Sequence, residues 1–377
     1  MTTNLSPASV SPGEPPRPEP AIVNRAAQAE ATARQLHAAL ADVFAASEVR
    51  VEPGDEPVIL FRGRLLTDAE AALTRLLPRF RSLNYTPLLR REGKVDLVAA
   101  VPGIQEAVRS RVWVHVGLFL LTLVTTTMVG ALLFGAGSLG TLRGWLSGLP
   151  FSLTLLAILG IHEMGHYLMA RWHGMSATLP YFIPMPPPFI GTLGAVVIMR
   201  SPTRNRATLF DVGFGGPIAG FLVALPLLII GLVLSEVRMG TPNLGRPLLI
   251  ELLVALLKPH GPGYAVQLHP VAVAAYFGIL LTGLNLVPVG QLDGGHVAYA
   301  ALGRWAQPVA LFSLTAMVFM GLFLWQGWLV WALLALFSGL RRPAPLNDIT
   351  PLDPARQVVA LGALLLFALT FVPVPFR

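Results

Sequence analysis

Hydrophobic and polar positions divide the chain into a short polar part and a long apolar part. Within residues 50–102, apolar and polar residues alternate over short runs separated by turn residues, which is typical of a small domain of strands and helices. An alanine-rich helix is predicted over 21–46, ahead of this domain. Within the domain, the predicted elements in chain order are a strand over 57–65, a helix over 66–80 capped by Thr67 or Asp68, and strands over 85–91 and 94–101.

Apolar stretches follow, several of them long enough to cross a membrane, which takes about 20 apolar residues. The segment Leu248–Leu257 is too short and predicts a re-entrant or interfacial piece. The predicted spans cover residues 112–134, 151–170, 212–234, 269–289, 308–325, 328–340 and 358–372. The break at Gln326-Gly327 leaves the count open, so the fold class predicted is an α-helical polytopic membrane protein with about 6–7 transmembrane helices and a small N-terminal α+β soluble domain.

Composition supports this division. Only 12% of the 377 residues are charged, against about 25% in soluble proteins, and the mean hydropathy is +0.64. The net charge of +7 comes from scattered arginines rather than a basic patch, so no nucleic acid partner is expected. The chain has no cysteine, which excludes disulfides and thiolate metal sites and leaves His, Asp and Glu as metal ligands.

More arginines flank the predicted spans on one side of the membrane than on the other. By the positive-inside rule, the side with more arginines faces the cytoplasm. With alternating spans, one side receives Arg109, Arg111, Arg171, Arg200, Arg204, Arg206, Arg304, Arg341 and Arg342. This predicts a multi-pass protein of a bacterial plasma membrane with its N-terminal domain in the cytoplasm.

The sequence His162-Glu163-Met164-Gly165-His166 lies inside one predicted span. Ionisable residues are costly in hydrocarbon, so such a cluster indicates function. His162 and His166 lie four residues apart on one helix face and can bind one zinc ion, while Glu163 beside them can take a proton from water. The sequence therefore predicts a hydrolytic metal site within the membrane.

Catalytic zinc usually has three protein ligands, so a third is needed from another segment. Asp293, in the stretch 285–296 that reads NLVPVGQLDGGH, is the best candidate, because Pro288 breaks the helix there and Gly294 and Gly295 permit a close backbone approach. Two alternatives stay open: Asp293 caps the next helix, or His296 is the third ligand.

These two motifs together resemble the site-2 protease family of intramembrane zinc metalloproteases, with HEMGH matching HExxH and NLVPVGQLDGGH matching NxxPxxxLDG. The resemblance covers roughly residues 112–300. It implies one Zn²⁺ per chain held by His162, His166 and Asp293, with Glu163 as catalytic acid and base, and Asn285 helping to hold the substrate backbone or the oxyanion. The segment 235–268 is too short for the PDZ domain that many bacterial relatives carry, so the chain looks more like the plastid and cyanobacterial branch with an N-terminal soluble domain.

The function expected from the resemblance is cleavage of transmembrane segments of single-span membrane proteins in the lipid bilayer, as in regulated intramembrane proteolysis. A membrane zinc transporter or a non-proteolytic metallohydrolase is the alternative, and the oligomeric state is left open. The domains expected are a disordered tail over 1–20, an α+β domain over 21–108, a metalloprotease core over 109–304 and C-terminal transmembrane helices over 305–377.

Three further features carry expectations. Residues 189–199 predict a strand or hairpin that re-enters the membrane, either to pair with an unwound substrate or as a connecting loop. Gly216 and Gly220 predict close packing against the helix that carries HEMGH, with a substrate path as the alternative. His173, His260 and His269 are interpreted as solvated or interfacial residues.

Overall fold

The structure is a computed structural model that describes residues 20–52, 54, 57–104, 111–135, 139–187, 190–241, 244–337 and 344–376. The chain forms two units, over residues 1–104 and 105–377. Apart from Pro20, the predicted disordered tail lies outside the described residues.

The N-terminal unit is a four-stranded antiparallel sheet with two helices, in the order α1 (Pro20–Leu40), β1 (Phe44–Glu52), β2 (Val58–Leu65), α2 (Ala69–Arg81), β3 (Tyr85–Glu92) and β4 (Val95–Pro102). The sheet order is β1-β2-β4-β3. Leu36 of α1, Phe61 of β2 and Leu73 of α2 are fully buried in the core of this unit. Asp68 caps α2 by accepting from the N–H groups of Glu70 and Ala71, as one of the two predicted caps.

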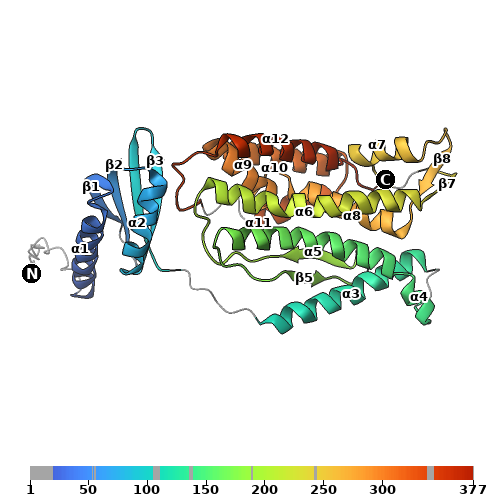
Figure 1. Ribbon diagram of the computed structural model, residues 1–377, viewed down its shortest axis with the longest axis horizontal. Coiled ribbons are helices and arrows are strands. Elements are labelled where there is room, and N and C mark those ends of the chain that lie inside the picture. Colours follow the sequence, from blue (N-terminus) through green and yellow to red (C-terminus); the bar gives the residue numbers. More distant parts are fainter. Residues whose placement is uncertain are drawn as a thin grey trace, which may run out of the picture. The chain divides into compact units, whose positions relative to one another are not determined.

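The second unit consists mainly of helices (Figure 1). They are α3 (Val112–Phe134), α4 (Leu142–Leu146), α5 (Leu149–Trp172), α6 (Arg206–Val233), α7 (Leu248–Leu257), α8 (Pro270–Asn285), α9 (Asp293–Leu302), α10 (Ala306–Phe323), α11 (Gly327–Phe337) and α12 (Pro354–Thr370). Two antiparallel hairpins join them, β5 (Tyr181–Pro184) with β6 (Thr192–Val196), and β7 (Glu236–Met239) with β8 (Tyr264–Gln267).

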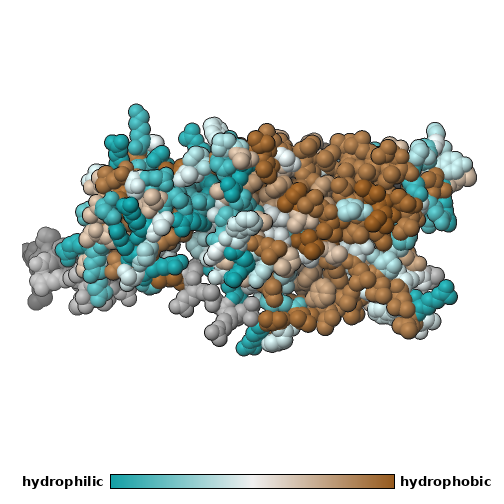
Figure 2. Space-filling view, in the orientation of Figure 1, coloured by the Kyte–Doolittle hydropathy of each residue, from teal (hydrophilic) through white to brown (hydrophobic). Residues whose placement is uncertain are grey.

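Among the described residues, four helical stretches are long and apolar enough to cross a membrane: 112–134, 142–172, 206–233 and 293–323. Shorter apolar helices are α7, α8, α11 and α12. Figure 2 shows a broad apolar surface over the helices of this unit and polar residues at its β7–β8 end. The unit is therefore mostly helical with four candidate membrane spans among its described residues, while the predicted count of about 6–7 spans stays a prediction.

The span predicted over 269–289 is shorter in the structure, because α8 ends at Asn285. Pro288 lacks a backbone N–H and disfavours helical backbone at the residue before it, so the chain leaves the helix three residues ahead of it. The helix predicted from 212 begins earlier, at Arg206, where the Asn205 side chain accepts from Thr208 N at 2.9 Å and supplies the cap.

Helices α5 and α6 lie side by side at van der Waals distance (Figure 1). A Cβ added at Gly165 of α5 would lie 2.3 Å from the Gly215 carbonyl oxygen of α6. A Cβ at Gly220 would lie 3.0 Å from the His162 Cβ. The predicted close packing of this glycine stretch against the HEMGH helix is confirmed, and it brings the α6 backbone into reach of the two histidines.

The β5–β6 hairpin is anchored on α3. His115 Nδ1 lies 3.1 Å from the Pro180 carbonyl oxygen, just before β5, and Thr125 Oγ1 donates to the Gly191 carbonyl oxygen at 2.6 Å, just before β6. Phe119 of α3 packs edge-on against Phe182 of β5. The strand expected within 189–199 is present as β6, and Phe189 lies outside the described residues.

Candidate metal centre and active site

His162 and His166 lie one turn apart on α5 and direct their imidazoles to one point. Their Nε2 atoms are 3.3 Å apart, and both residues are buried, with 4% and 8% of their surface exposed. Helix α5 is apolar over most of its other positions, so the two rings lie among packed helices rather than at a surface. The HExxH spacing therefore presents two imidazole nitrogens together inside the helical unit.

Asp293 comes to the same point from another helix. Its Oδ2 lies 3.3 Å from His162 Nε2, and its Oδ1 lies 3.3 Å from His166 Nε2. Asp293 is the first residue of α9, and the N-cap residue of this helix is Leu292, which makes no side-chain cap bond. The alternative that the Asp293 carboxylate caps the helix is therefore not what the structure shows. A Cβ at Gly294 would lie 1.9 Å from the Leu286 carbonyl oxygen, so only glycine allows the start of α9 to return this close to the end of α8.

The spacing of these three groups fits zinc. Within the described part of the chain, His162, His166 and Asp293 are the group of metal-ligating side chains whose ligand atoms lie within 4.8 Å of one another. Tetrahedral zinc with ligands at about 2.0–2.1 Å places neighbouring ligand atoms roughly 3.3 Å apart. The observed separations of 3.3 Å match that value. Two imidazoles and one carboxylate are also a known catalytic zinc set that leaves a coordination position open.

The orientation of His166 is set by a backbone group. Its Nδ1 lies 2.7 Å from the Val212 carbonyl oxygen of α6, so the Nδ1–H donates there and Nε2 carries the free lone pair. Gly216 makes this contact possible, because a Cβ at that position would lie 2.1 Å from His166 Nε2. The glycine face of α6 and the Val212 carbonyl thus fix the ring for metal binding.

Glu163 faces a cavity of about 550 Å³ beside the centre. His166, Asp293 and Asn285 also line this cavity, together with the chain from 195 to 199. Val197, next to the end of β6, and Glu163 line the same cavity. The end of β6 therefore borders the same cavity as Glu163 and two of the metal-ligating groups.

The remaining candidate residues are near the centre. Asn285 ends α8, and its Nδ2 lies 3.4 Å from His162 Nε2. His296 lines the cavity, but its Nδ1 lies 3.1 Å from the Leu292 carbonyl oxygen of its own helix, and it is not part of the cluster of His162, His166 and Asp293. The geometry therefore favours Asp293 over His296 as the third ligand.

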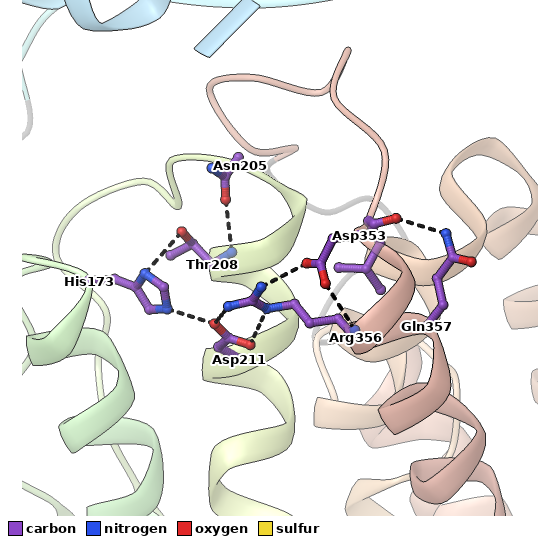
Figure 3. A network of polar contacts seen from close by, with 8 residues as sticks. His173, Asn205, Thr208, Asp211, Asp353, Arg356 and Gln357 are labelled. Atoms are coloured by element: carbon purple, nitrogen blue, oxygen red, sulfur yellow. Dashed lines mark hydrogen bonds and ion pairs between the residues drawn. The ribbon is translucent and has the colours of Figure 1, made fainter. Parts of the chain in front are cut away.

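One residue near the centre was misjudged from sequence. His173 is not simply solvated, since its Nε2 lies 2.8 Å from Asp211 Oδ2 and its Nδ1 lies 3.4 Å from Thr208 Oγ1 (Figure 3). Asp211 also binds Arg356 of α12. The spacing of His173 seven residues after His166, on the same helix, was the available signal, but its partners are distant in sequence.

An HExxH helix and a carboxylate as third ligand, which converge in an apolar helical unit, define the class of zinc-type metallohydrolases. Residues 150–325 match the model of peptidase family M50, the site-2 protease family of zinc metalloproteases. The predicted resemblance is confirmed, and Zn²⁺ is the metal that the family and the donor set imply.

Curated relatives support the same family. Over 241 residues the chain is 33% identical to "Probable zinc metalloprotease EGY1, chloroplastic" of Arabidopsis thaliana, covering 60% of this chain and 43% of the relative. It is 31% identical over 240 residues to the EGY1 protein of Oryza sativa subsp. japonica, with 60% and 41% covered, and 32% identical over 244 residues to the EGY2 protein of Arabidopsis thaliana, with 61% and 42% covered. The chain thus spans less than half the length of these relatives. No solved structure matches it significantly.

These relatives correct the predicted location. The expectation of a bacterial plasma membrane, with the N-terminal domain in the cytoplasm, is wrong, because the relatives are chloroplastic proteins of plants. Arginine asymmetry reports how spans are oriented relative to a membrane, but it carries no information on which membrane holds them.

Proposed function

We propose that this chain is an intramembrane zinc endopeptidase that cuts transmembrane segments of other membrane proteins, as in regulated intramembrane proteolysis. The observation that carries the proposal is the meeting of His162, His166 and Asp293 beside Glu163, within a helical unit apolar enough for a bilayer. The match of residues 150–325 to peptidase family M50 supports peptide-bond cleavage as the chemistry.

Each residue has a proposed role. His162, His166 and Asp293 hold the zinc ion, which when bound supplies a Lewis acid that activates water and polarises the scissile carbonyl. Glu163 lies in the adjoining cavity, takes a proton from the attacking water at its carboxylate and later returns it to the leaving amine. Asn285, at the end of α8, donates from its side-chain amide to the substrate backbone or the oxyanion.

The proposed substrates are single-span membrane proteins that enter as extended chain. A helix hides its peptide groups, so the bond to be cut must lie in an unwound segment. We propose that this segment pairs with β6, whose continuation at Val197 borders Glu163, by β-addition. The hairpin anchors on α3, through His115 and Thr125, support a fixed template.

The proposal includes a domain arrangement. Residues 109–304 form the protease core, residues 305–377 form C-terminal transmembrane helices, and the α+β domain over 21–108 serves as a docking or regulatory module. The shorter apolar helices α8, α11 and α12 also lie in the bilayer in this proposal, which gives about 6–7 spans. A chain this apolar needs lipid around the second unit.

The test is cleavage of a single-span substrate by the full chain in proteoliposomes, compared with the Glu163→Gln variant. We expect both proteins to contain one zinc per chain, and the variant to cut at least about 10²-fold more slowly, because the amide cannot accept the proton. Equal cleavage by Glu163→Gln would disprove the role of Glu163.

The same experiment separates the alternatives. A zinc transporter would move zinc into the vesicles and leave the substrate intact, and a non-proteolytic metallohydrolase would bind zinc and depend on Glu163 without cutting the polypeptide. Either result would overturn the proposed peptidase activity.

A further inference from the structure

Three ion-paired residues, from α6, α12 and the end of α5, form a network of polar contacts (Figure 3). Asp211 of α6 accepts two hydrogen bonds from Arg356 of α12, at 2.7 Å from Nε to Oδ1 and at 2.7 Å from Nη2 to Oδ2. His173 Nε2, at the end of α5, lies 2.8 Å from Asp211 Oδ2. Asp211 is thus held by a bidentate fork and an imidazole at once, the strong form of charge-assisted bonding.

The Arg356 side chain is also held by a residue at the start of its own helix. Asp353 caps α12 by accepting from the backbone N–H of Arg356 at 3.1 Å, and its other oxygen accepts from Arg356 Nη1 at 2.7 Å. The guanidinium therefore lies between two carboxylates, one on its own helix and one on α6. This geometry restricts the side chain of Arg356 and the position of Asp211 along α6.

Asp211 precedes Val212, whose carbonyl oxygen orients His166. The His166 Nδ1 to Val212 oxygen distance is 2.7 Å, so a small rotation or shift of α6 at this turn would lengthen the bond and turn the imidazole. His173 ties the end of α5 to the same turn through Asp211 and Thr208. The two helices that carry and orient His166 are therefore joined by the network.

We infer that Arg356 and Asp211 are positioning residues of the metal centre, through which the C-terminal helix α12 sets the orientation of His166. This rests on the proposed zinc site and adds to it a part of the chain beyond residues 150–325, the segment that matches the family. By this inference the core over 109–304 does not hold zinc at full affinity without α12.

The neighbouring contact of Arg206 offers a matched control. Arg206 begins α6 and donates from Nε to Asp348 Oδ1 at 2.8 Å, and Asp348 also accepts from Tyr299 at 2.7 Å. This ion pair joins α6 to the segment before α12, as Arg356 does, but it lies more than one turn away from Val212. Its loss tests general anchoring of α6 without disturbing the Asp211 turn.

The experiment measures zinc affinity of the full chain by competition with a chromophoric chelator, and the visible spectrum of the cobalt-substituted protein, for wild type, Arg356→Gln, Asp211→Asn and Arg206→Gln. We expect Arg356→Gln and Asp211→Asn to bind zinc about tenfold more weakly and to shift the cobalt bands, as loss of an outer-shell partner does. Arg206→Gln should stay within about twofold of wild type in affinity, with an unchanged spectrum.

A conservative variant keeps the test decisive if Arg356→Gln does not fold. Arg356→Lys retains the cation but loses the fork, so its affinity should fall between wild type and Asp211→Asn. Unchanged affinity and spectrum in the Arg356 and Asp211 variants, or an equal change in Arg206→Gln, would overturn the inference. If wild type and His166→Ala bind zinc equally, the proposed zinc site itself fails, which is a different result.

Discussion

Gly216 shows how strictly single residues are constrained around the two histidines. A Cβ at this position would lie 2.1 Å from His166 Nε2, the atom proposed to bind zinc. The position of a Cβ is fixed by the backbone, so an alanine at this position has no rotamer that relieves the contact. The His166 ring or helix α6 would have to move instead. The metal centre therefore depends on a residue with no side chain.

We predict that Gly216→Ala lowers zinc affinity by roughly tenfold to a hundredfold, the range seen when the support of a metal ligand is lost. Gly362→Ala is the matched control, since a Cβ there meets nothing within 4 Å. Zinc titration of both purified variants checks this, and normal zinc binding by Gly216→Ala would show that His166 is not a ligand in the observed rotamer.

Asp96 gives a pH prediction in the N-terminal unit. Burial alone would raise the pKa of Asp96, but hydrogen bonds from the Arg91 side chain and the Leu65 N–H outweigh it and hold the pKa below its ordinary value of 3.8. A lowered pKa in the folded state stabilises the fold above 3.8, and this contribution is lost as the pH falls through the lowered pKa.

We therefore expect Asp96→Asn to destabilise the N-terminal unit by about 1 kcal/mol at pH 7, a modest value because Arg91 is half exposed. Wild type should lose the same amount of unfolding free energy when the pH falls below 3.8, so the stabilities of the two proteins should become equal there. Hydrogen exchange of peptides from β2 and β4 measures both effects, and a difference that persists at low pH would contradict the assignment.

Residue-scale prediction from the sequence succeeded where chemistry and helical spacing coincide. HExxH placed His162 and His166 on one face, and the LDGG stretch indicated Asp293 because its glycines permit close approach. The Val212 carbonyl and the partners of His173 could not be predicted. The residue type at position 212 does not indicate that its backbone carbonyl accepts a hydrogen bond. Arg356, the further partner of Asp211, lies 145 residues away in the sequence.

Elements were predictable where one periodicity dominates. Helices α3 and α7 begin and end where their apolar runs do, and the pattern over 57–101 gave β2, α2, β3 and β4. Strand β1 was missed, because its first residues continue an alanine-rich run that favours helix. Strand β5 was also missed, since its partner β6 follows a proline-rich run and pairing depends on the support of α3.

At the element scale, we predict that Val196→Pro abolishes cleavage while zinc content stays at wild-type level. Proline removes a backbone N–H and disturbs the edge at which the substrate is proposed to pair. Val237→Pro in β7, the other hairpin of the second unit, is the control and should still cut. Cleavage and zinc assays on the same preparations check this, and normal cleavage by Val196→Pro would show that β6 is only a connecting segment.

On the scale of the whole molecule, the chain separates into two units at about residue 104. The proposed zinc ligands and Glu163 all belong to the second unit. A chain lacking residues 1–104 should therefore bind zinc with wild-type affinity, and any change in cleavage should depend on the substrate if the α+β domain is a docking module. Zinc titration of the shortened chain checks this, and loss of zinc would mean that the first unit supports the metal centre.

The most direct test of the central claim is the position of the bond that is cut. The full chain and its Glu163→Gln variant would be reconstituted with a single-span substrate, and the new termini identified by mass spectrometry. The account predicts paired termini inside the membrane-spanning segment, formed by wild type, lost with a zinc chelator and absent with Glu163→Gln. Cleavage only outside that segment, or equal products from the variant, would contradict it.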